Sequence, residues 1–538
     1  MDGRRIDRLP SFIRDLDARP GAVRTLIVAA VAAGAAGLNP PVTWPGNPGV
    51  QSAIRAQPQI NNLVLGVTVV AAGLLFVGGV IVDTNGRRRI LLVSLATLTI
   101  TSLVGLVLPP GTLFALSRVV AAAAMTAVLP FSLALIVTTY AGMTRPTAIG
   151  IVYAAWGGAM AVSPVLFTIL GPAGPYWPSF VASALACAGA LWFVRTRVPD
   201  LSHVTRADRP YVIATAVWAF AVVMISAGIV NFSGSTSYPL RIALIVTGLA
   251  MLVGWGIWSM RRRDADRLRA LRVERRPVTV AIAVGVIFGF AQAAPLFQLP
   301  LFFNLILRFG PFWGIVATAP FIVALVVAGP IAGALLARFR PRTLVAGGLA
   351  FVGLGNVASA LVLGRDAAYA FFILPLAMIG AGFVVGTTVR TAIIFASVSR
   401  SVPGTAAALN EASILVGSRI GLAALTALIT QRATEIFAAS LGPLDATTVA
   451  REVDVFQSVL IAIGTPNLSQ IVGTIAPETL ASYIRAFVEA YRESLLLTGG
   501  LALVAAPLAW LGLGARDPLA TMWDHRDERE ERATAPTT

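Results

Sequence analysis

The chain has 538 residues, of which 57% are hydrophobic and only 12% are charged. Soluble domains carry about a quarter charged residues, so this composition excludes an ordinary soluble fold and predicts an all-α integral membrane protein. The net charge of +16 could suggest a nucleic-acid partner. The arginines cluster instead in short segments between apolar runs, as membrane topology requires, so no nucleic-acid partner is expected.

Fourteen apolar runs are long enough to cross a bilayer. The first six lie near 25–42, 59–82, 90–108, 112–138, 148–171 and 177–196, the next two near 210–231 and 239–260, and the last six near 277–307, 311–336, 343–364, 368–392, 404–429 and 494–514. This pattern predicts 14 transmembrane helices, arranged as two pseudo-symmetric six-helix bundles with two inserted linker helices.

The expected organisation is an N-terminal tail (1–24), a six-helix bundle (25–200), two inserted helices with an arginine-rich loop (201–276), a second six-helix bundle (277–514) and a C-terminal tail (515–538). Arginine is concentrated in alternate connecting segments. Because positive residues favour the cytoplasmic side, we expect both tails in the cytoplasm of a multi-pass protein of the cell (inner, cytoplasmic) membrane.

A long segment, 430–493, separates the last two runs and is expected outside. Pro477 opens a stretch whose apolar residues share one helical face, which predicts an amphipathic helix leading into the last span. Either this helix packs on its own protein, or it binds lipid or a partner.

A polar turn lies between the second and third runs and includes Gly79, Asp83 and the arginines 87–89. One carboxylate and three arginines are too costly in hydrocarbon, so the turn marks a membrane face. The second half carries a partial copy, Gly333 to Arg342, which keeps the glycine and the arginines and lacks the carboxylate. Weak repetition between halves is typical of transporters built from structural repeats, with the substrate site where the repeats meet.

The turn has the spacing G-x-x-x-D-x-x-G-R-R, and the chain resembles the major facilitator superfamily, specifically its fourteen-span drug:proton antiporter group. Three further stretches carry the resemblance. Leu116 to Arg118, followed by Met125 to Pro130 and Ser132 to Ile136, is similar to the arginine-bearing fourth span. Leu299 to Leu305 with Gly314 to Gly353 is similar to spans nine to eleven, and Gly404 to Glu411 with Gly417 and Gly421 is similar to span thirteen.

The resemblance implies that the turn locks a cytoplasmic gate as the two halves rock. The residues that carry this implied role are Gly79, Asp83, Gly86, Arg87 and Arg88. A carboxylate at a helix N-terminus is favourable, and a partly desolvated ion pair can hold one of two states. The alternative is a fixed loop anchor that does not switch.

Two positions depart from the pattern of that group. Asn39 is the polar residue nearest to the place in span 1 where the group usually has an aspartate. The pair Gly157-Gly158, followed by Ser163-Pro164, matches the antiporter pattern of span 5 only in part.

Asp83 lies in the turn, so Glu411 is the acidic residue that lies within a span. It is about 10 Å into the run 404–429 at a rise of about 1.5 Å per residue. A carboxylate there is costly unless it is paired, protonated or hydrated. We therefore predict that Glu411 carries a coupling proton; the alternative is a static ion pair or a hydrogen-bonded structural carboxyl.

Three arginines also lie within spans. The resemblance implies that Arg118 tunes proton transfer or contacts substrate, with helix packing as the alternative. Arg390 lies near the inner end of its span and is expected to snorkel. Arg419 lies about 12 Å beyond Glu411 along the helix, too far for an easy direct pair, and replaces a small residue of the resembling pattern.

Asn39 and Asn304 complete the set of residues predicted for proton coupling or the substrate pathway. Gln292 and Gln298 lie in the same run as Asn304 and could also orient a ligand, although hydrogen bonding between helices is the commoner use of such groups.

One carboxylate against two or three arginines leaves the interior neutral to positive, which suits neutral, amphiphilic or anionic compounds. The sequence has no phosphate-binding G-x-x-x-x-G-K-[ST] loop, and His203 and His525 lie in polar segments, so neither enzymatic activity, a cofactor nor a metal is expected. We predict a proton-coupled secondary exporter of hydrophobic or amphiphilic compounds or drugs, working by alternating access in the lipid bilayer. The alternatives are an exporter of a lipid or cell-envelope amphiphile, and a non-transporting membrane scaffold or sensor.

Overall fold

The structure is a computed structural model of the chain. It describes residues 22–39, 87–108, 112–140, 144–170, 177–197, parts of 217–228, 238–261, 275–309, 313–314, 316–364, 367–397, 403–441, 446–462 and 475–514. Every regular element in these ranges is a helix. Helices are expected in apolar runs because hydrocarbon offers no partner to an unpaired backbone amide.

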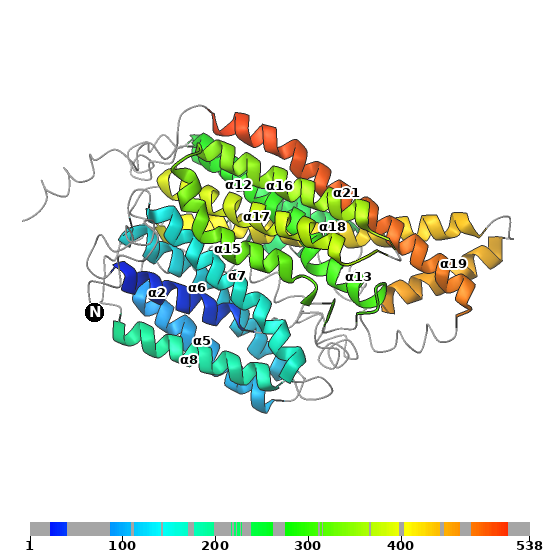
Figure 1. Cartoon of the computed structure of the whole chain (residues 1–538). Coiled ribbons are helices and arrows are strands. Elements are labelled where there is room, and N and C mark those ends of the chain that lie inside the picture. Colours follow the sequence, from blue (N-terminus) through cyan, green and yellow to red (C-terminus); the bar gives the residue numbers. More distant parts are fainter. Residues whose placement is uncertain are drawn as a thin grey trace, which may run out of the picture.

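Five helices form the described part of the N-terminal half: α2 (Ala22–Gly37), α5 (Arg87–Val107), α6 (Thr112–Thr139), α7 (Thr144–Leu170) and α8 (Trp177–Arg197). Their alanine- and glycine-rich faces let backbones approach closely. Helix α5 packs against α6 and α8, and α2 packs against α6, α7 and α8 (Figure 1). The expected run 59–82 lies outside the described residues.

The C-terminal half contains α12 (Arg275–Ala293), the π-helix η3 (Ala294–Gln298), α13 (Leu299–Leu305), α15 (Ala319–Leu336), α16 (Pro341–Val362), α17 (Ala370–Ser397), α18 (Pro403–Ser440), α19 (Ala446–Ala462) and α21 (Pro477–Leu513). Helix α16 packs against α17 and α21, and α12 packs against α18 and α21. The two halves lie side by side in Figure 1.

Between the halves, α10 (Tyr238–Arg261) packs on the residues described in 217–228. Gly228 faces Arg241 and Ile245, while Gly248 faces Ala221 and Ile225. The two segments therefore run antiparallel, as expected for a pair of inserted helices.

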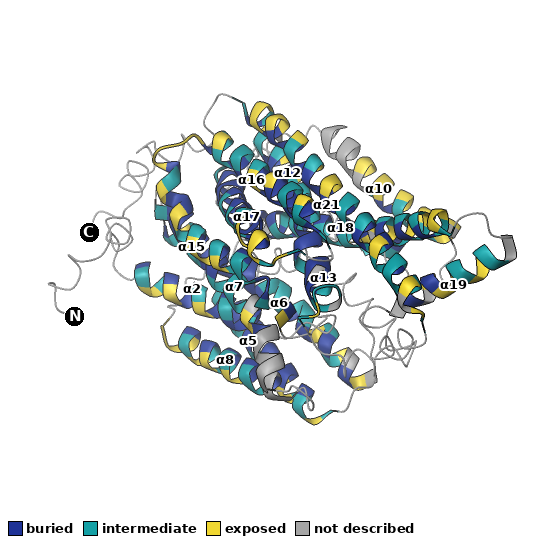
Figure 2. Ribbon diagram, turned by 45° about the vertical axis from the view of Figure 1, so that its right-hand side comes forward, coloured by how far each residue is buried: buried dark blue, intermediate teal, exposed yellow. Residues whose placement is uncertain are grey.

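Eight helices in the described ranges are long and apolar enough to cross a membrane, and shorter apolar helices lie at Ala22–Gly37 and Pro239–Met251. Large apolar side chains remain exposed, for example Ile100, Leu185 and Leu361. Figure 2 shows exposed residues along the outer helices of the bundle. Such surfaces fit contact with lipid. The chain is thus a multi-pass membrane protein, while the total of fourteen spans stays a prediction.

The run 277–307 is not one regular helix, because it contains the π-helix η3. Pro295 has no amide hydrogen, so the carbonyl of Ala291, four residues earlier, loses its usual donor. The Asn356 amide Nδ2 lies 3.5 Å from that carbonyl, and the hydroxyl of Tyr491 lies 3.4 Å from the carbonyl of Ala294. Two neighbouring helices thus supply donors where the proline interrupts α12.

The segment expected as an external loop is largely helical. Helix α18 continues to Ser440, and the predicted helix at Pro477 is the first part of α21, continuous with the last span. Together with α19 these ends form a helical extension that projects from one end of the bundle (Figure 1). Phe437, Phe456 and Tyr483, one from each helix, pack together in tilted and edge-to-face pairs with ring centroids 4.6–4.8 Å apart. The amphipathic helix therefore packs on its own protein.

Candidate functional site

Several helix ends that carry arginines lie on one side of the protein, here called the arginine-bearing end. Arg88, at the start of α5, donates to the carbonyl of Arg195 at the end of α8 (3.0 Å). Arg276, at the start of α12, donates to the carbonyls of Leu511 and Gly512 at the end of α21. Arg342, at the start of α16, donates to the carbonyl of Gly514 directly after α21. These contacts agree with the alternating arginine pattern, because they bring the expected arginine-bearing ends together.

The two halves meet along α7, which packs against α15 and α17, and along α18, which packs against α6. Gly150 of α7 faces Gly329 of α15 so closely that a Cβ on Gly150 would overlap the Gly329 carbonyl. Gly333 faces Thr147 in the same way, nearer the arginine-bearing end. In this structure the halves are therefore in tight contact on that side.

Glu411 lies at this interface. It sits on α18, eight residues after Pro403, and is half-buried. The hydroxyl of Tyr153, on α7 of the opposite half, donates a 2.5 Å hydrogen bond to its Oε1. Asn410 Nδ2 donates to the same oxygen at 2.8 Å. The carboxylate is thus held by two donors, one from each half.

A wider network surrounds this contact. Asn410 Nδ2 also donates to the Tyr153 hydroxyl (2.7 Å), and Thr391 of α17 donates to Asn410 Oδ1 (3.0 Å). The hydroxyls of Thr391 and Tyr153 lie 3.0 Å apart. Helices α7, α17 and α18 therefore share one polar cluster, which can respond as a unit to the protonation of Glu411.

Arg390 corrects an expectation, because it does not snorkel. Its side chain is fully buried between helices. Nη1 donates to the carbonyl of Ala281 (3.1 Å) and to Ser413 Oγ (2.8 Å), and Nη2 donates to the carbonyl of Asn410 (3.1 Å). Arg390 therefore braces the backbone of Asn410, the residue beside Glu411.

Arg118 is also fully buried, inside the N-terminal half. Its Nη2 donates to the carbonyl of Thr101, and the guanidinium lies over the rings of Phe180 (4.6 Å) and Phe114 (5.6 Å). These contacts join α5, α6 and α8. They fit the helix-packing alternative, and they place Arg118 away from Glu411.

Asn39 is buried just after the end of α2. Its Nδ2 lies 3.2 Å from the hydroxyl oxygens of both Ser102 and Ser183, and these two oxygens are 3.1 Å apart. The amide thus joins α2, α5 and α8 through a neutral polar cluster, where an aspartate was expected from the resemblance.

The remaining predicted residues are not part of the Glu411 cluster. Arg419 makes no hydrogen bond or ion pair with the described residues, and its buried Nε has no partner. Asn304 is half-buried in α13 and faces Gly314. Gln298, at the end of η3, is buried, and neither of its amide atoms has a hydrogen-bond partner among the described residues.

The gate motif is described only in part. Gly79, Asp83 and Gly86 lie outside the described residues, and Arg87 begins α5. Arg88 reaches the end of α8, as noted above. In the described part of the motif, Arg88 therefore lies at the C-terminus of α8, where the carbonyl dipoles favour a cation.

Sequence reasoning missed Tyr153, Thr391 and the role of Asn410. The available signal was weak: Tyr153 is the only tyrosine in the run 148–171, and its hydroxyl needs a partner when buried. Nothing in the sequence pairs it with Glu411, 258 residues away.

Two helical halves that meet around a buried polar cluster define a membrane transporter of the repeat-built kind. Residues 25–422 match the family model for the Major Facilitator Superfamily, and the chain belongs to this family.

Two relatives and one solved structure illustrate the similarity. The chain is 31% identical over 401 residues to the puromycin resistance protein pur8 of Streptomyces alboniger, covering 71% of this chain and 76% of that protein. It is 26% identical over 366 residues to a triacylglyceride transporter of Mycobacteroides abscessus, covering 64% and 69%. The structure of the proton:xylose symporter XylE matches with a TM-score of 0.56 at 13% identity, covering 93% of this chain and 99% of that chain, which shows the shared fold.

Proposed function

We propose that this protein is a proton-coupled exporter of hydrophobic or amphiphilic compounds that works by alternating access. The observation that carries the proposal is the Tyr153–Glu411 hydrogen bond, because it links an intramembrane carboxylate directly to the contact between the two halves. A carboxylate there is a functional candidate by default.

The proposed coupling follows from hydrogen-bond chemistry. An ionised carboxylate only accepts hydrogen bonds, and here it accepts from Tyr153 and Asn410. Protonation of Glu411 removes the charge that makes these bonds strong, because charge-assisted hydrogen bonds are about twice as strong as neutral ones. Proton uptake therefore weakens the contact between α7 and α18, and proton release restores it.

The cargo is proposed from two observations. One carboxylate and several arginines leave the interior neutral to positive, which suits neutral, amphiphilic or acidic compounds. The relative from Streptomyces alboniger is a puromycin resistance protein, which supports export of drug-like compounds. The similarity to a triacylglyceride transporter favours a second candidate, export of a lipid or cell-envelope amphiphile.

The orientation and the gate are part of the proposal. We place the arginine-bearing end and both termini in the cytoplasm of the cell membrane, because arginine favours that side. Arg88, the described part of the proposed gate motif, contacts the end of α8 on this side. We propose that the motif residues Gly79, Asp83, Gly86, Arg87 and Arg88 act there as the gate. A third possibility, a scaffold or sensor that uses the helical extension, would need no proton movement.

Everted membrane vesicles test the proposal. The lumen is acidified by respiration and followed with a pH-sensitive dye, and the primary amide of 11-(dansylamino)undecanoic acid is added as a neutral amphiphile. We expect the amphiphile to alkalinise the lumen with the wild-type protein and not with Glu411→Gln, while Glu478→Gln, which changes an exposed carboxylate, behaves as wild type. Equal proton movement with Glu411→Gln would refute the coupling role, and none in any variant would favour the scaffold.

A further inference from the structure

The three intramembrane arginines differ in how their guanidinium groups are satisfied. Arg118 has a carbonyl and two aromatic rings, and Arg390 has two carbonyls and a hydroxyl. Arg118 Nη1 and Arg390 Nε are buried without a partner, as Arg419 Nε is, but other nitrogens of those two groups are bonded. Arg419 has no such bond: its guanidinium makes no hydrogen bond or ion pair with the described residues. An arginine within a membrane-spanning helix is costly and normally pairs with a carboxylate or with backbone carbonyls. Arg419 is therefore the one of the three that lacks a structural explanation.

The rotation of α18 directs Arg419 away from α12. Gly417 and Gly421 pack directly on Val286 and Phe290 of α12. Arg419 is two residues from each of them, which is about 160–200° around the helix at about 100° per residue. It therefore lies on the side of α18 away from α12. Helix α18 contacts α6 of the N-terminal half, and its Glu411 meets Tyr153 of that half. Glu411 is eight residues from Arg419, which is about 80° around the helix, so Arg419 lies closer to the interface side of α18 than to its α12 side.

The side chain of Arg419 is partly buried by the protein and partly accessible to a ligand. Its Nε is fully covered, whereas the side chain as a whole is only half-buried. It lies near the middle of α18, sixteen residues after Pro403 and twenty-one before Ser440. Glu411 is about 12 Å away along the helix axis at about 1.5 Å per residue and is already held by other donors. No described acidic side chain compensates the charge.

We propose that Arg419 binds the acidic head group of an amphiphilic cargo. This inference rests on the proposed transport function and names its substrate class. A guanidinium presents parallel N–H donors that match the two oxygens of a carboxylate or the oxygens of a phosphate. Leu415 and Leu422, one turn to either side of Arg419 and half-buried, offer apolar contact to an alkyl tail. The required ligand chemistry is an oxyanion on an apolar chain.

Binding to the purified full-length protein in detergent tests this. The probes are 11-(dansylamino)undecanoic acid and its uncharged primary amide, followed by energy transfer from tryptophan to the dansyl group. We expect the wild type to bind the acid at least about tenfold more tightly than the amide, a difference of about 1.4 kcal/mol. Arg419→Gln should remove this preference, and Arg419→Lys should keep part of it. Arg338→Gln removes one exposed arginine outside the spans and should leave the preference intact.

Further arms complete the experiment. Competition by dodecyl phosphate, compared with dodecanoate, decides whether Arg419 favours phosphate or carboxylate. The melting temperature of each variant reports whether it is folded. A loss of preference for the acid is interpreted only for a variant that shows a melting transition. If Arg419→Gln does not fold, Arg419→Lys replaces it in the comparison. A wild type without preference for the acid, or a folded Arg419→Gln that retains it, overturns the inference. These experiments measure binding alone. The binding preference can therefore be absent while the neutral amide still drives proton movement, or be present while proton movement is absent, so the two proposals are tested separately.

Discussion

The hydroxyl of Tyr153 donates a 2.5 Å hydrogen bond to Oε1 of Glu411, and the two residues belong to opposite halves of the protein. Few described polar contacts cross the interface between the halves, and this one ends on an ionisable group. The energy of the contact therefore depends on a proton.

Replacing Tyr153 by phenylalanine keeps the ring and removes the donor. We expect the contact at the arginine-bearing end to weaken, so that spin labels at Arg89→Cys and Arg338→Cys, in a Cys187→Ala background, show a larger share of long distances. Tyr369→Phe is the matched control, because its hydroxyl bonds to Ala317 within one half. An unchanged distance distribution in Tyr153→Phe would show that the hydrogen bond does not hold the halves together.

Gly150→Val tests the close approach of α7 and α15. A side chain at Gly150 would overlap the carbonyl of Gly329, and overpacking of this kind costs about 1–3 kcal/mol. We expect the halves to separate at this end and amphiphile-driven proton movement to fall at least tenfold. Gly347→Ala is the control, since a Cβ there meets nothing within 4 Å. Normal proton movement in Gly150→Val would mean that this contact is not needed in the cycle.

Arg390→Lys is predicted to lower stability. Lysine cannot reach the carbonyls of Ala281 and Asn410 and the hydroxyl of Ser413 together, and each buried group left without a partner costs about 1–3 kcal/mol. Thermal unfolding in detergent should show a lower melting temperature than wild type, whereas the exposed change Arg338→Lys should not. Wild-type stability in Arg390→Lys would restore the snorkelling interpretation.

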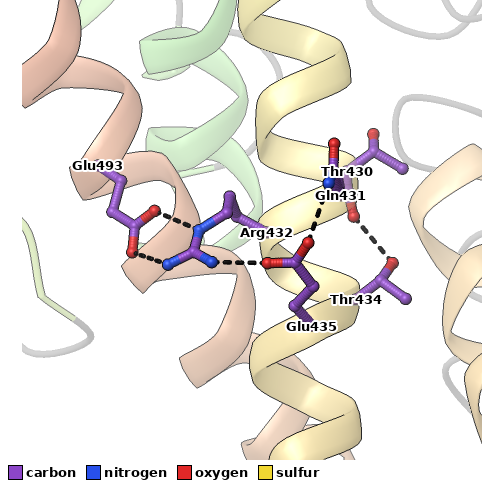
Figure 3. A network of polar contacts seen from close by, with 6 residues as sticks. All are labelled: Thr430, Gln431, Arg432, Thr434, Glu435 and Glu493. Atoms are coloured by element: carbon purple, nitrogen blue, oxygen red, sulfur yellow. Dashed lines mark hydrogen bonds and ion pairs between the residues drawn. The ribbon is translucent and has the colours of Figure 1, made fainter.

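The helical extension should depend on its aromatic core more than on its ion pairs. Arg432 joins Glu435 (2.6 Å) and Glu493 (2.7 Å) in a network on the surface (Figure 3). Exposed ion pairs contribute about 0–1 kcal/mol, whereas truncating a buried aromatic residue costs about 3–5 kcal/mol.

Hydrogen exchange in Ala446–Ala462 measures the difference. We expect Phe456→Ala to raise exchange strongly and Arg432→Gln only slightly. Faster exchange in Arg432→Gln than in Phe456→Ala would reverse this ranking.

The sequence predicted much of this fold because spans are long apolar runs and charged turns have no place in hydrocarbon. It located Glu411 for the same reason, since a lone carboxylate in an apolar run is conspicuous. The sequence did not identify its partner, Tyr153, because a tyrosine in a membrane span carries little free-energy cost and because the two residues belong to different halves of the fold. The prediction that Arg390 snorkels was wrong. It rested on the position of Arg390 near the end of its apolar run, whereas the rotation of α17 directs the side chain into the protein. The π-helix was not foreseen, although Pro295 and Pro300 were visible.

The most direct test measures the distance between spin labels at positions 89 and 338 as a function of pH, in the wild type and in Glu411→Gln. An ionised Glu411 holds both donors, so the wild type should be closed at high pH and open as the pH falls. Glutamine carries no charge and cannot titrate, so Glu411→Gln should show the low-pH distribution at every pH. Identical pH dependence in the two proteins, or none in the wild type, would contradict the account.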